Sequence, residues 1–176
     1  MPAVAGLKEM YPQLKKAVIK LNDGFSGDGN AVFRYPENLS GKLMHDWIDC
    51  NLCDVLKPVA TDLSTDLFME KFVLMEGIAE AFVEGDIKAS PSVQCRINPL
   101  GEVDVISTHD QVLTGDTGQI FVGAYFPADE AYRSEISAQS KAIAEILKKE
   151  GVLGRFSIDF ISVKEGSTWK HYAIEI

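Results

Sequence analysis

The alternation of apolar and polar residues near the start of the chain predicts a β-hairpin. Residues 16–23 alternate in this way and end in Asp23-Gly24, which is typical of a strand that runs into a turn. Residues 31–35 form the next apolar run and would be the returning strand. We therefore expect two paired strands whose connecting tip spans residues 23–30.

Helical spacing of apolar residues follows this hairpin. Residues 41–56 carry apolar side chains three and four positions apart, and Pro58 follows as a stop signal. A second, shorter helix is predicted at about residues 64–72. Residues 72–84 are largely apolar and are followed by Gly85, so part of this stretch should be a buried strand.

The clearest helix is predicted at residues 134–150, which carry one apolar face. Ser134 is expected to cap its N-terminus, and Gly151 is expected to end it. Lys148 and Lys149 would complement the helix dipole at the C-terminal end.

Three more segments have strand patterns. Residues 91–106, which are interrupted by Pro99-Leu100-Gly101, predict a second hairpin. Residues 155–163 and 169–176 predict two strands that are joined around residues 165–167.

This succession of hairpins and helices predicts an α+β fold, because strands and helices do not alternate as they do in a doubly wound parallel sheet. We expect two lobes, residues 1–83 and residues 84–176. The chain ends within a strand pattern at Glu175-Ile176, so we also expect it to be a piece of a longer protein.

Composition and charge narrow the classes of function. The chain has 176 residues, of which 46% are hydrophobic and 24% charged, as in an ordinary globular protein. Its formal net charge of -9 argues against nonspecific binding to nucleic acid or to an anionic membrane. The sequence also contains neither an apolar run that could span a bilayer nor a signal-peptide pattern. We therefore expect a soluble, cytoplasmic protein without a nucleic-acid or membrane partner.

The spacing of the cysteines gives one candidate metal or redox site. Three cysteines are too few for a disulfide framework, which agrees with a reducing compartment. Cys50 and Cys53 form a C-x-x-C, but they lie in a predicted helix without a second pair, so ordinary helical side chains are favoured over a metal or redox site.

Residues 107–111 are all polar and would either line a cleft or form a turn with side-chain caps.

A lysine followed by a glycine-rich tip forms a candidate phosphate site. Gly24, Gly27 and Gly29 lie among short polar residues, so backbone amides of the tip could point together at a phosphate. Lys20 lies on the strand that leads into the tip and could neutralise the same phosphate. The tip lacks the Gly-Lys-Ser/Thr ending of a P-loop. The loop taken alone favours the alternative, a flexible hairpin with a solvated lysine.

Two acidic residues in the last predicted hairpin form a candidate metal site. A three-residue loop at residues 165–167 would place Asp159 opposite Ala173. The same loop would place Glu175 opposite Ser157. The two carboxylates would then be diagonal neighbours on one face, about 7–8 Å apart at Cα. Carboxylate oxygens suit Mg²⁺, particularly beside a polyphosphate. The alternative is a pair of acids on a solvated face, and a register change of one residue would separate them onto opposite faces.

Taken in their order along the chain, the lysine with its glycine-rich tip, the apolar hinge strand and the paired acidic strands resemble the ATP-grasp superfamily of carboxylate-amine ligases. The similarity runs over nearly the whole chain. Four segments look like the branch that includes the peptide ligase of pheganomycin biosynthesis, namely residues 90–94, 107–111, 126–128 and 154–160. The resemblance implies two α+β lobes whose antiparallel sheets enclose a nucleotide cleft.

The resemblance also implies a role for each candidate residue. Lys20 looks like the lysine that holds the nucleotide phosphates, and Asp159 and Glu175 look like the acids that bind Mg²⁺. The loop that closes over the phosphates would consist of Gly24, Phe25, Ser26, Gly27, Gly29 and Asn30. The hinge that reads adenine would consist of Glu80, Ala81, Phe82 and Val83. Asp86 or Glu84 would hold the ribose.

The implied activity is ATP-dependent joining of a carboxylate to an amine, possible substrates being amino acids or peptides. A carboxylate would attack the γ-phosphate of ATP to give an acyl phosphate, which the amine then attacks. Arg96 and Arg155 are candidates for the arginine of such a site. Either could instead pair with Glu102 or Asp104.

Two other functions remain open from the sequence. The chain as given could be a binding module that holds ATP without turnover, which is what we expect if it is a piece of its parent. It could also be an interaction domain with no nucleotide site.

Overall fold

The structure is a computed structural model that describes residues 2–24, 27–115 and 118–176. The chain separates into two units. The first contains Met1–Val83 and Thr114–Phe121, and the second contains Glu84–Leu113 and Val122–Ile176. The segment Thr114–Phe121 therefore groups with the first unit, whereas the expected lobes placed it in the second. The division into two ATP-grasp lobes stays a prediction.

The first unit is a four-stranded sheet with helices. Its elements are α1 (Pro2–Met10), β1 (Lys16–Leu21), β2 (Asn30–Arg34), α2 (Gly41–Val55), β3 (Lys57–Pro58), α3 (Thr65–Met75) and β4 (Gly77–Ala81). The strand order is β3-β2-β1-β4, and all neighbours are antiparallel. The hairpin β1–β2 and the helices α2 and α3 confirm the sequence predictions, and α3 continues three residues past the expected end. Helix α1 was not predicted.

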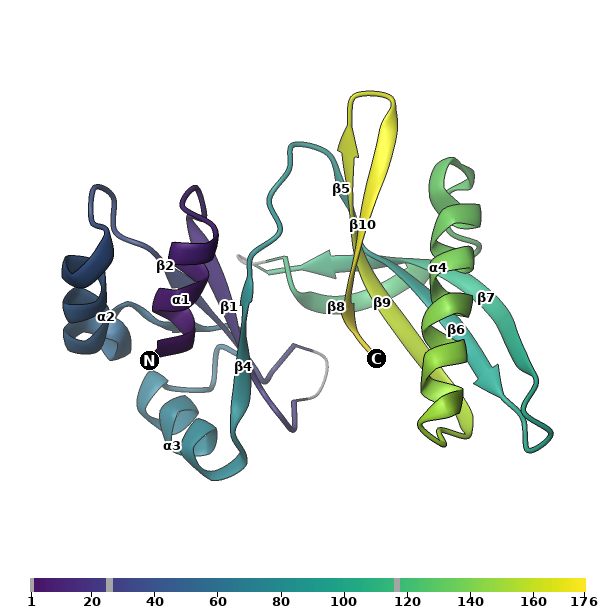
Figure 1. Ribbon diagram of the computed structural model, residues 1–176, viewed down its shortest axis with the longest axis horizontal. Helices are drawn as coiled ribbons and strands as arrows, with labels where there is room; N and C mark the ends of the chain where they lie inside the picture. The colour runs from purple at the N-terminus through teal and green to yellow at the C-terminus, as the bar shows by residue number, and fades with distance from the viewer. Residues whose placement is uncertain (1, 25–26, 116–117) are drawn as a thin grey trace. The chain divides into compact units, whose positions relative to one another are not determined.

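Strand alternation divides this sheet into two faces. Ala17, Ile19 and Phe33 point to one face, where they join the core with buried residues of α1, α2 and α3. The three helices cover this face (Figure 1). Since successive side chains of a strand point to opposite sides, Lys16 and Lys20 of β1 belong to the other face.

The second sheet carries one helix. Its elements are β5 (Lys88–Ala89), β6 (Pro91–Ile97), β7 (Val103–Thr114), β8 (Ile120–Tyr125), α4 (Glu130–Lys149), β9 (Gly154–Glu165) and β10 (Thr168–Glu175). The order is β10-β9-β6-β7-β8, and β5 also pairs with β9. The hairpin β6–β7 and the strands β9 and β10 confirm the predictions.

Helix α4 packs on one face of this sheet (Figure 1). Tyr132 and Ile136 of the helix contact a core that includes Val93 of β6 and Ile158 and Phe160 of β9. Ser92 and Gln94 flank Val93 in β6, and Ser157 and Asp159 flank Ile158 in β9, so these polar residues project from the face opposite α4.

The predicted N-terminus of the long helix is wrong. Helix α4 begins at Glu130, and its N-cap is Asp129, whose carboxylate accepts a hydrogen bond from the amide of Ala131 at 2.8 Å. Ser134 lies inside the helix. The cap is earlier because an aspartate before the first turn satisfies a free helical amide as well as a serine does.

A strand was predicted within residues 72–84 and is present, but the prediction that it is buried is wrong. Helix α3 takes the first part of that stretch and ends at Met75. Strand β4 starts at Gly77 and has no fully buried residue; Ile78 is 50% exposed. The reason is that β4 lies at an edge of its sheet. No helix in the described part of the chain is long and apolar enough to cross a membrane.

Candidate functional site

Lys20 of β1 forms an ion pair with Glu80 of β4. The Nζ atom of Lys20 lies 2.8 Å from Oε2 of Glu80, and the lysine side chain is 15% exposed. In the register of the sheet, Glu80 is opposite Val18 and Lys20 is opposite Ile78, so the two charged residues are diagonal neighbours on the face away from the helices. Both residues were predicted site residues, but no sequence pattern predicted that they form a pair.

The glycine-rich tip is closed by backbone contacts. The amide of Leu21 donates to the carbonyl of Gly29 at 2.9 Å, and that of Asn30 donates to the carbonyl of Gly27 at 3.0 Å. A Cβ atom on Gly29 would lie 2.7 Å from the Cα of Gly24, closer than such atoms approach. Gly29 is therefore required by the packing of the loop itself. The candidates Phe25 and Ser26 lie outside the described residues.

A segment distant in sequence lies against this tip. Nδ2 of Asn30 donates to Oε1 of Gln119 at 2.9 Å. Gly27 has a φ of +85°, and a Cβ atom there would lie 2.8 Å from the carbonyl oxygen of Gln119. Gln119 was not predicted as a site residue, since no local pattern connects two residues that lie 89 positions apart.

The predicted hinge residues lie at the end of β4 and just after it. The amide of Phe82 donates to the carbonyl of Lys16 at 3.1 Å, and the ammonium of Lys16 lies 4.8 Å from the centre of the Phe82 ring. The chain passes from the first unit to the second between Val83 and Glu84. Asp86 follows as an exposed residue. A role of these residues in binding adenine and ribose stays a prediction.

Asp159 and Glu175 are direct cross-strand partners in β9 and β10. The predicted partners were wrong, because Glu165 pairs with Thr168 and the turn is one residue shorter than expected. An irregularity between Ala173 and Glu175 then shifts the register by one more residue in the same direction, which places Glu175 opposite Asp159. Directly opposite residues project from the same face, so the two carboxylates share a face in spite of the change in the turn.

Asp159 also accepts a hydrogen bond from the neighbouring strand on its other side. The hydroxyl of Ser92 in β6 donates to Oδ1 of Asp159 at 2.6 Å. Ser92 is the register partner of both Asp159 and His109 of β7. A row of four residues therefore crosses four strands on the face opposite α4, in the order Glu175, Asp159, Ser92, His109.

The next row on this face is uncharged. Gln94 of β6 is the register partner of Ser157 in β9 and of Ser107 in β7. The hydroxyl of Ser107 lies 2.9 Å from Nε2 of His109, so the two rows are in contact on β7. We call these two rows the polar face.

The polar face fits a hard cation through two carboxylates. Among the described residues, no group of three or more histidine, cysteine, aspartate or glutamate side chains is placed to hold a metal ion. A cation held by Asp159 and Glu175 would thus take its remaining ligands from water or phosphate oxygens. Mg²⁺ is bound in this way in many proteins.

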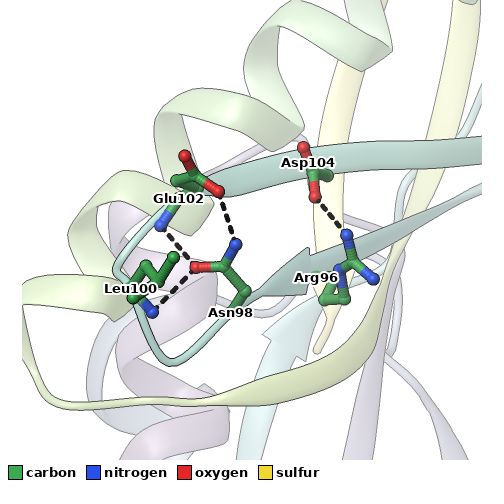
Figure 2. A network of polar contacts seen from close by, with 5 residues as sticks. All are labelled: Arg96, Asn98, Leu100, Glu102 and Asp104. Carbon is green, nitrogen blue, oxygen red and sulfur yellow. Dashed lines mark hydrogen bonds and ion pairs between the residues drawn. The ribbon is translucent and has the colours of Figure 1, made fainter.

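The two candidate arginines lie further along the same strands. Arg96 is paired with Asp104, with Nη2 2.7 Å from Oδ2, which is one of the alternatives that the sequence left open. Figure 2 shows this pair beside the turn of the β6–β7 hairpin, where Oδ1 of Asn98 accepts from the amides of Leu100 and Glu102. Arg155 is exposed and is the register partner of Arg96.

Residues 107–111 lie within strand β7, so the turn that was one of their predicted alternatives is wrong, and a role in lining a cleft stays a prediction. Asp110 is structural: it accepts from the hydroxyl of Tyr132 at 2.6 Å and from the amide of Asp129 at 2.8 Å. Burial, reinforced by this hydrogen bond to Asp110, raises the pKa of Tyr132. Ser107 and His109 instead belong to the polar face. Cys50 and Cys53 are both exposed on α2, as helical side chains can be.

Comparison with known proteins gives one family match and one curated relative. Residues 57–175 match the family described as IQCH-like, ATP-grasp. Over 103 residues the chain is 38% identical to L-propargylglycine–L-glutamate ligase of Streptantibioticus cattleyicolor, an alignment that covers 58% of this chain. The alignment covers 20% of the relative, so the chain spans about a fifth of that protein.

Two solved structures have a similar fold. One is N5-carboxyaminoimidazole synthetase from Staphylococcus aureus complexed with ADP, with a TM-score of 0.55, 14% identity, and coverage of 97% of this chain and 36% of that one. The other is an ADP complex of N5-carboxyaminoimidazole ribonucleotide synthetase, with a TM-score of 0.52, 18% identity, and coverage of 95% and 36%. They confirm the α+β fold that the sequence predicted.

Proposed function

This chain belongs to the IQCH-like ATP-grasp family, and we propose that it is the nucleotide-binding part of an ATP-dependent ligase that joins a carboxylate to an amine. The similarity to a curated ligase whose name contains two amino acids supports amino acids or peptides as substrates. The ADP in the two similar structures supports ATP as the cofactor.

The observation that carries the proposal is the direct pairing of Asp159 with Glu175 on the polar face. Two carboxylates side by side repel each other unless a cation or a proton lies between them. Neighbouring hydroxyl and amide side chains are neutral, so the local chemistry favours a divalent cation that a polyphosphate brings with it. When bound there, Mg²⁺ would offset the negative charge of the nucleotide phosphates.

The remaining candidate residues would bind and orient the nucleotide. Lys20 would contact the phosphates through its ammonium, and the amides of the glycine-rich tip would donate to phosphate oxygens. The tip candidates are Gly24, Phe25, Ser26, Gly27, Gly29 and Asn30. The adenine candidates are Glu80, Ala81, Phe82 and Val83. Asp86 would accept from the ribose hydroxyls, and Arg96 or Arg155 would contact the carboxylate or the transferred phosphoryl group.

The proposed reaction has two steps. An oxygen of the substrate carboxylate bonds to the γ-phosphorus of ATP while the bond from that phosphorus to ADP breaks, which gives an acyl phosphate. The amine nitrogen then bonds to the carbonyl carbon, inorganic phosphate leaves, and the nitrogen loses a proton. Both steps require positioning and charge neutralisation more than covalent help from the protein.

Calorimetry with the full chain tests the proposal. We expect Mg-ATP to bind, and Asp159→Asn and Glu175→Gln each to weaken binding by about 10-fold or more, because each removes a charged ligand. Glu165→Gln is the matched control, since this exposed acid lies on the same strand as Asp159 but at the turn. Unchanged affinity in both site variants would contradict the assignment.

An assay of ADP formation in mixtures of carboxylates and amines separates a ligase from a binding module. Steady release of ADP that needs both substrates identifies ligation. Binding of Mg-ATP without ADP release would identify a module that binds ATP without turnover. Absence of any nucleotide binding would contradict the proposal and favour an interaction domain with no nucleotide site.

A further inference from the structure

Ser92 is a buried polar residue beside a candidate metal ligand. It is 5% exposed, and its hydroxyl donates to Oδ1 of Asp159 at 2.6 Å. Hydrogen bonds of this length to an ionised carboxylate are roughly twice as strong as those between neutral groups. The contact joins the central strand β6 to β9, so it belongs to the sheet and not to a loop.

A second contact sets the direction of this hydrogen bond. Nε2 of Gln94 donates to the Ser92 oxygen in a long contact of 3.5 Å. An amide nitrogen can only donate, and an ionised carboxylate can only accept. The Ser92 proton therefore points at Asp159, and the order of donation runs from Gln94 through Ser92 to Asp159.

We propose that Ser92 is a positioning residue, which orients the carboxylate of Asp159 for a divalent cation. This rests on the proposed function, in which Asp159 and Glu175 bind that cation. The hydrogen bond occupies one lone pair of Oδ1 and restricts rotation of the carboxylate about its last bond. The other oxygen of Asp159 would then be held in one orientation, and Asp159 is the register partner of Glu175 on the adjacent strand. Partners of this kind orient metal ligands and raise metal affinity in other proteins.

Binding of Mn²⁺ to the full chain, followed by electron paramagnetic resonance with and without ADP, tests the proposal without measuring activity. We expect Ser92→Ala to weaken Mn²⁺ binding about 10- to 100-fold. Ser92→Thr keeps the hydroxyl and should bind Mn²⁺ within a few-fold of the unaltered chain. Ser134→Ala is the control, because this exposed serine belongs to α4, which packs on the opposite face of the sheet, and the change should leave Mn²⁺ binding unchanged.

Ser92→Cys provides a second loss variant, since it leaves no cavity at the buried position and replaces the hydroxyl with a weak donor. Weaker Mn²⁺ binding in this variant, with a far-ultraviolet circular dichroism spectrum like that of the unaltered chain, supports the positioning role. Unchanged Mn²⁺ binding in Ser92→Cys, or in a folded Ser92→Ala, overturns it.

Asp159→Asn separates failure of this inference from failure of the proposed function. If Asp159→Asn abolishes Mn²⁺ binding while the Ser92 variants retain it, Ser92 has no positioning role but the metal site stands. If Asp159→Asn retains full binding, or if the unaltered chain does not bind Mn²⁺ with or without ADP, the site itself is wrong.

Discussion

The ammonium of Lys20 lies 2.8 Å from the carboxylate of Glu80, on two strands, β1 and β4, that are adjacent in space but separated in sequence by β2, α2, β3 and α3. Both side chains lie on the face of the sheet that the helices leave uncovered. The pair holds the lysine amine in place at low exposure. In the proposed function, nucleotide phosphates would contact the same ammonium.

Replacement of this lysine should weaken nucleotide binding. A hydrogen bond between charged groups contributes about 1.5–3 kcal/mol, so we expect Lys20→Ala to raise the dissociation constant for Mg-ATP about 10- to 100-fold. Lys15→Ala is the control, because Lys15 is an exposed lysine just before the same strand. Calorimetric titration measures both. Equal affinities for the two variants would remove Lys20 from the phosphate site.

The close approach inside the glycine-rich tip should make Gly29 intolerant of a side chain. A Cβ atom on Gly29 would lie 2.7 Å from the Cα of Gly24, and overpacking of this kind costs about 1–3 kcal/mol. In contrast, a Cβ atom on Gly6 of α1 would meet nothing within 4 Å. We expect Gly29→Ala to lower the free energy of unfolding, measured in urea, and Gly6→Ala to raise it by up to about 1 kcal/mol through helix propensity. A stable Gly29→Ala variant would argue against the tip geometry.

The position of the α4 cap predicts different effects for two neighbouring polar residues. Asp129→Ala removes the side chain that accepts from the amide of Ala131, and loss of such a cap costs about 0.5–2 kcal/mol. Ser134→Ala lies within the helix at an exposed position and should change the free energy of unfolding by less than about 0.5 kcal/mol. Chemical denaturation of both variants measures the difference. If Ser134→Ala lowered the free energy of unfolding more than Asp129→Ala does, Ser134 would be the N-cap, as the sequence predicted.

The stability of the first unit should fall at high pH because of Tyr35. Burial raises the pKa of Tyr35 to about 12, and its hydroxyl donates to the carbonyl of Val4 at 2.6 Å. A tyrosine in the unfolded chain ionises near pH 10. The folded state therefore holds this proton more tightly than the unfolded state. The contribution of the protonated Tyr35 phenol to the free energy of unfolding is complete below pH 10 and is lost as the pH rises towards 12.

Denaturation of the unaltered chain and of Tyr35→Phe between pH 9 and pH 11 checks this. The unaltered chain should lose stability over that range, and Tyr35→Phe should lose less, because it has no phenol to ionise at that position. Parallel pH dependences for the two proteins would show that Tyr35 does not cause the effect.

Local patterns were sufficient for most of the elements and for the faces of the strands. The strand pattern at residues 155–163 predicted β9, and the alternation within it agrees with the core around α4, because Phe156, Ile158 and Phe160 belong to that core and Asp159 does not. Such patterns are informative because apolar side chains are buried on the face of a strand that packs against the core, and polar side chains lie on the other face. The end of a helix was less well determined, since both Asp129 and Ser134 are residue types that can cap.

The amino-acid sequence by itself determined the α+β class, the order of hairpins and helices, and which residues could carry charge to a phosphate or a cation, because these depend on periodicity and residue type. Only the tertiary structure decided which of them meet. Lys20 meets Glu80 because β4 pairs with β1. Asp159 lies opposite Glu175 because a short turn and an irregularity in β10 each shift the register by one residue. Ser92 contacts Asp159 from a third strand. Contacts of this kind depend on register and on strand order, which no local stretch of residues encodes.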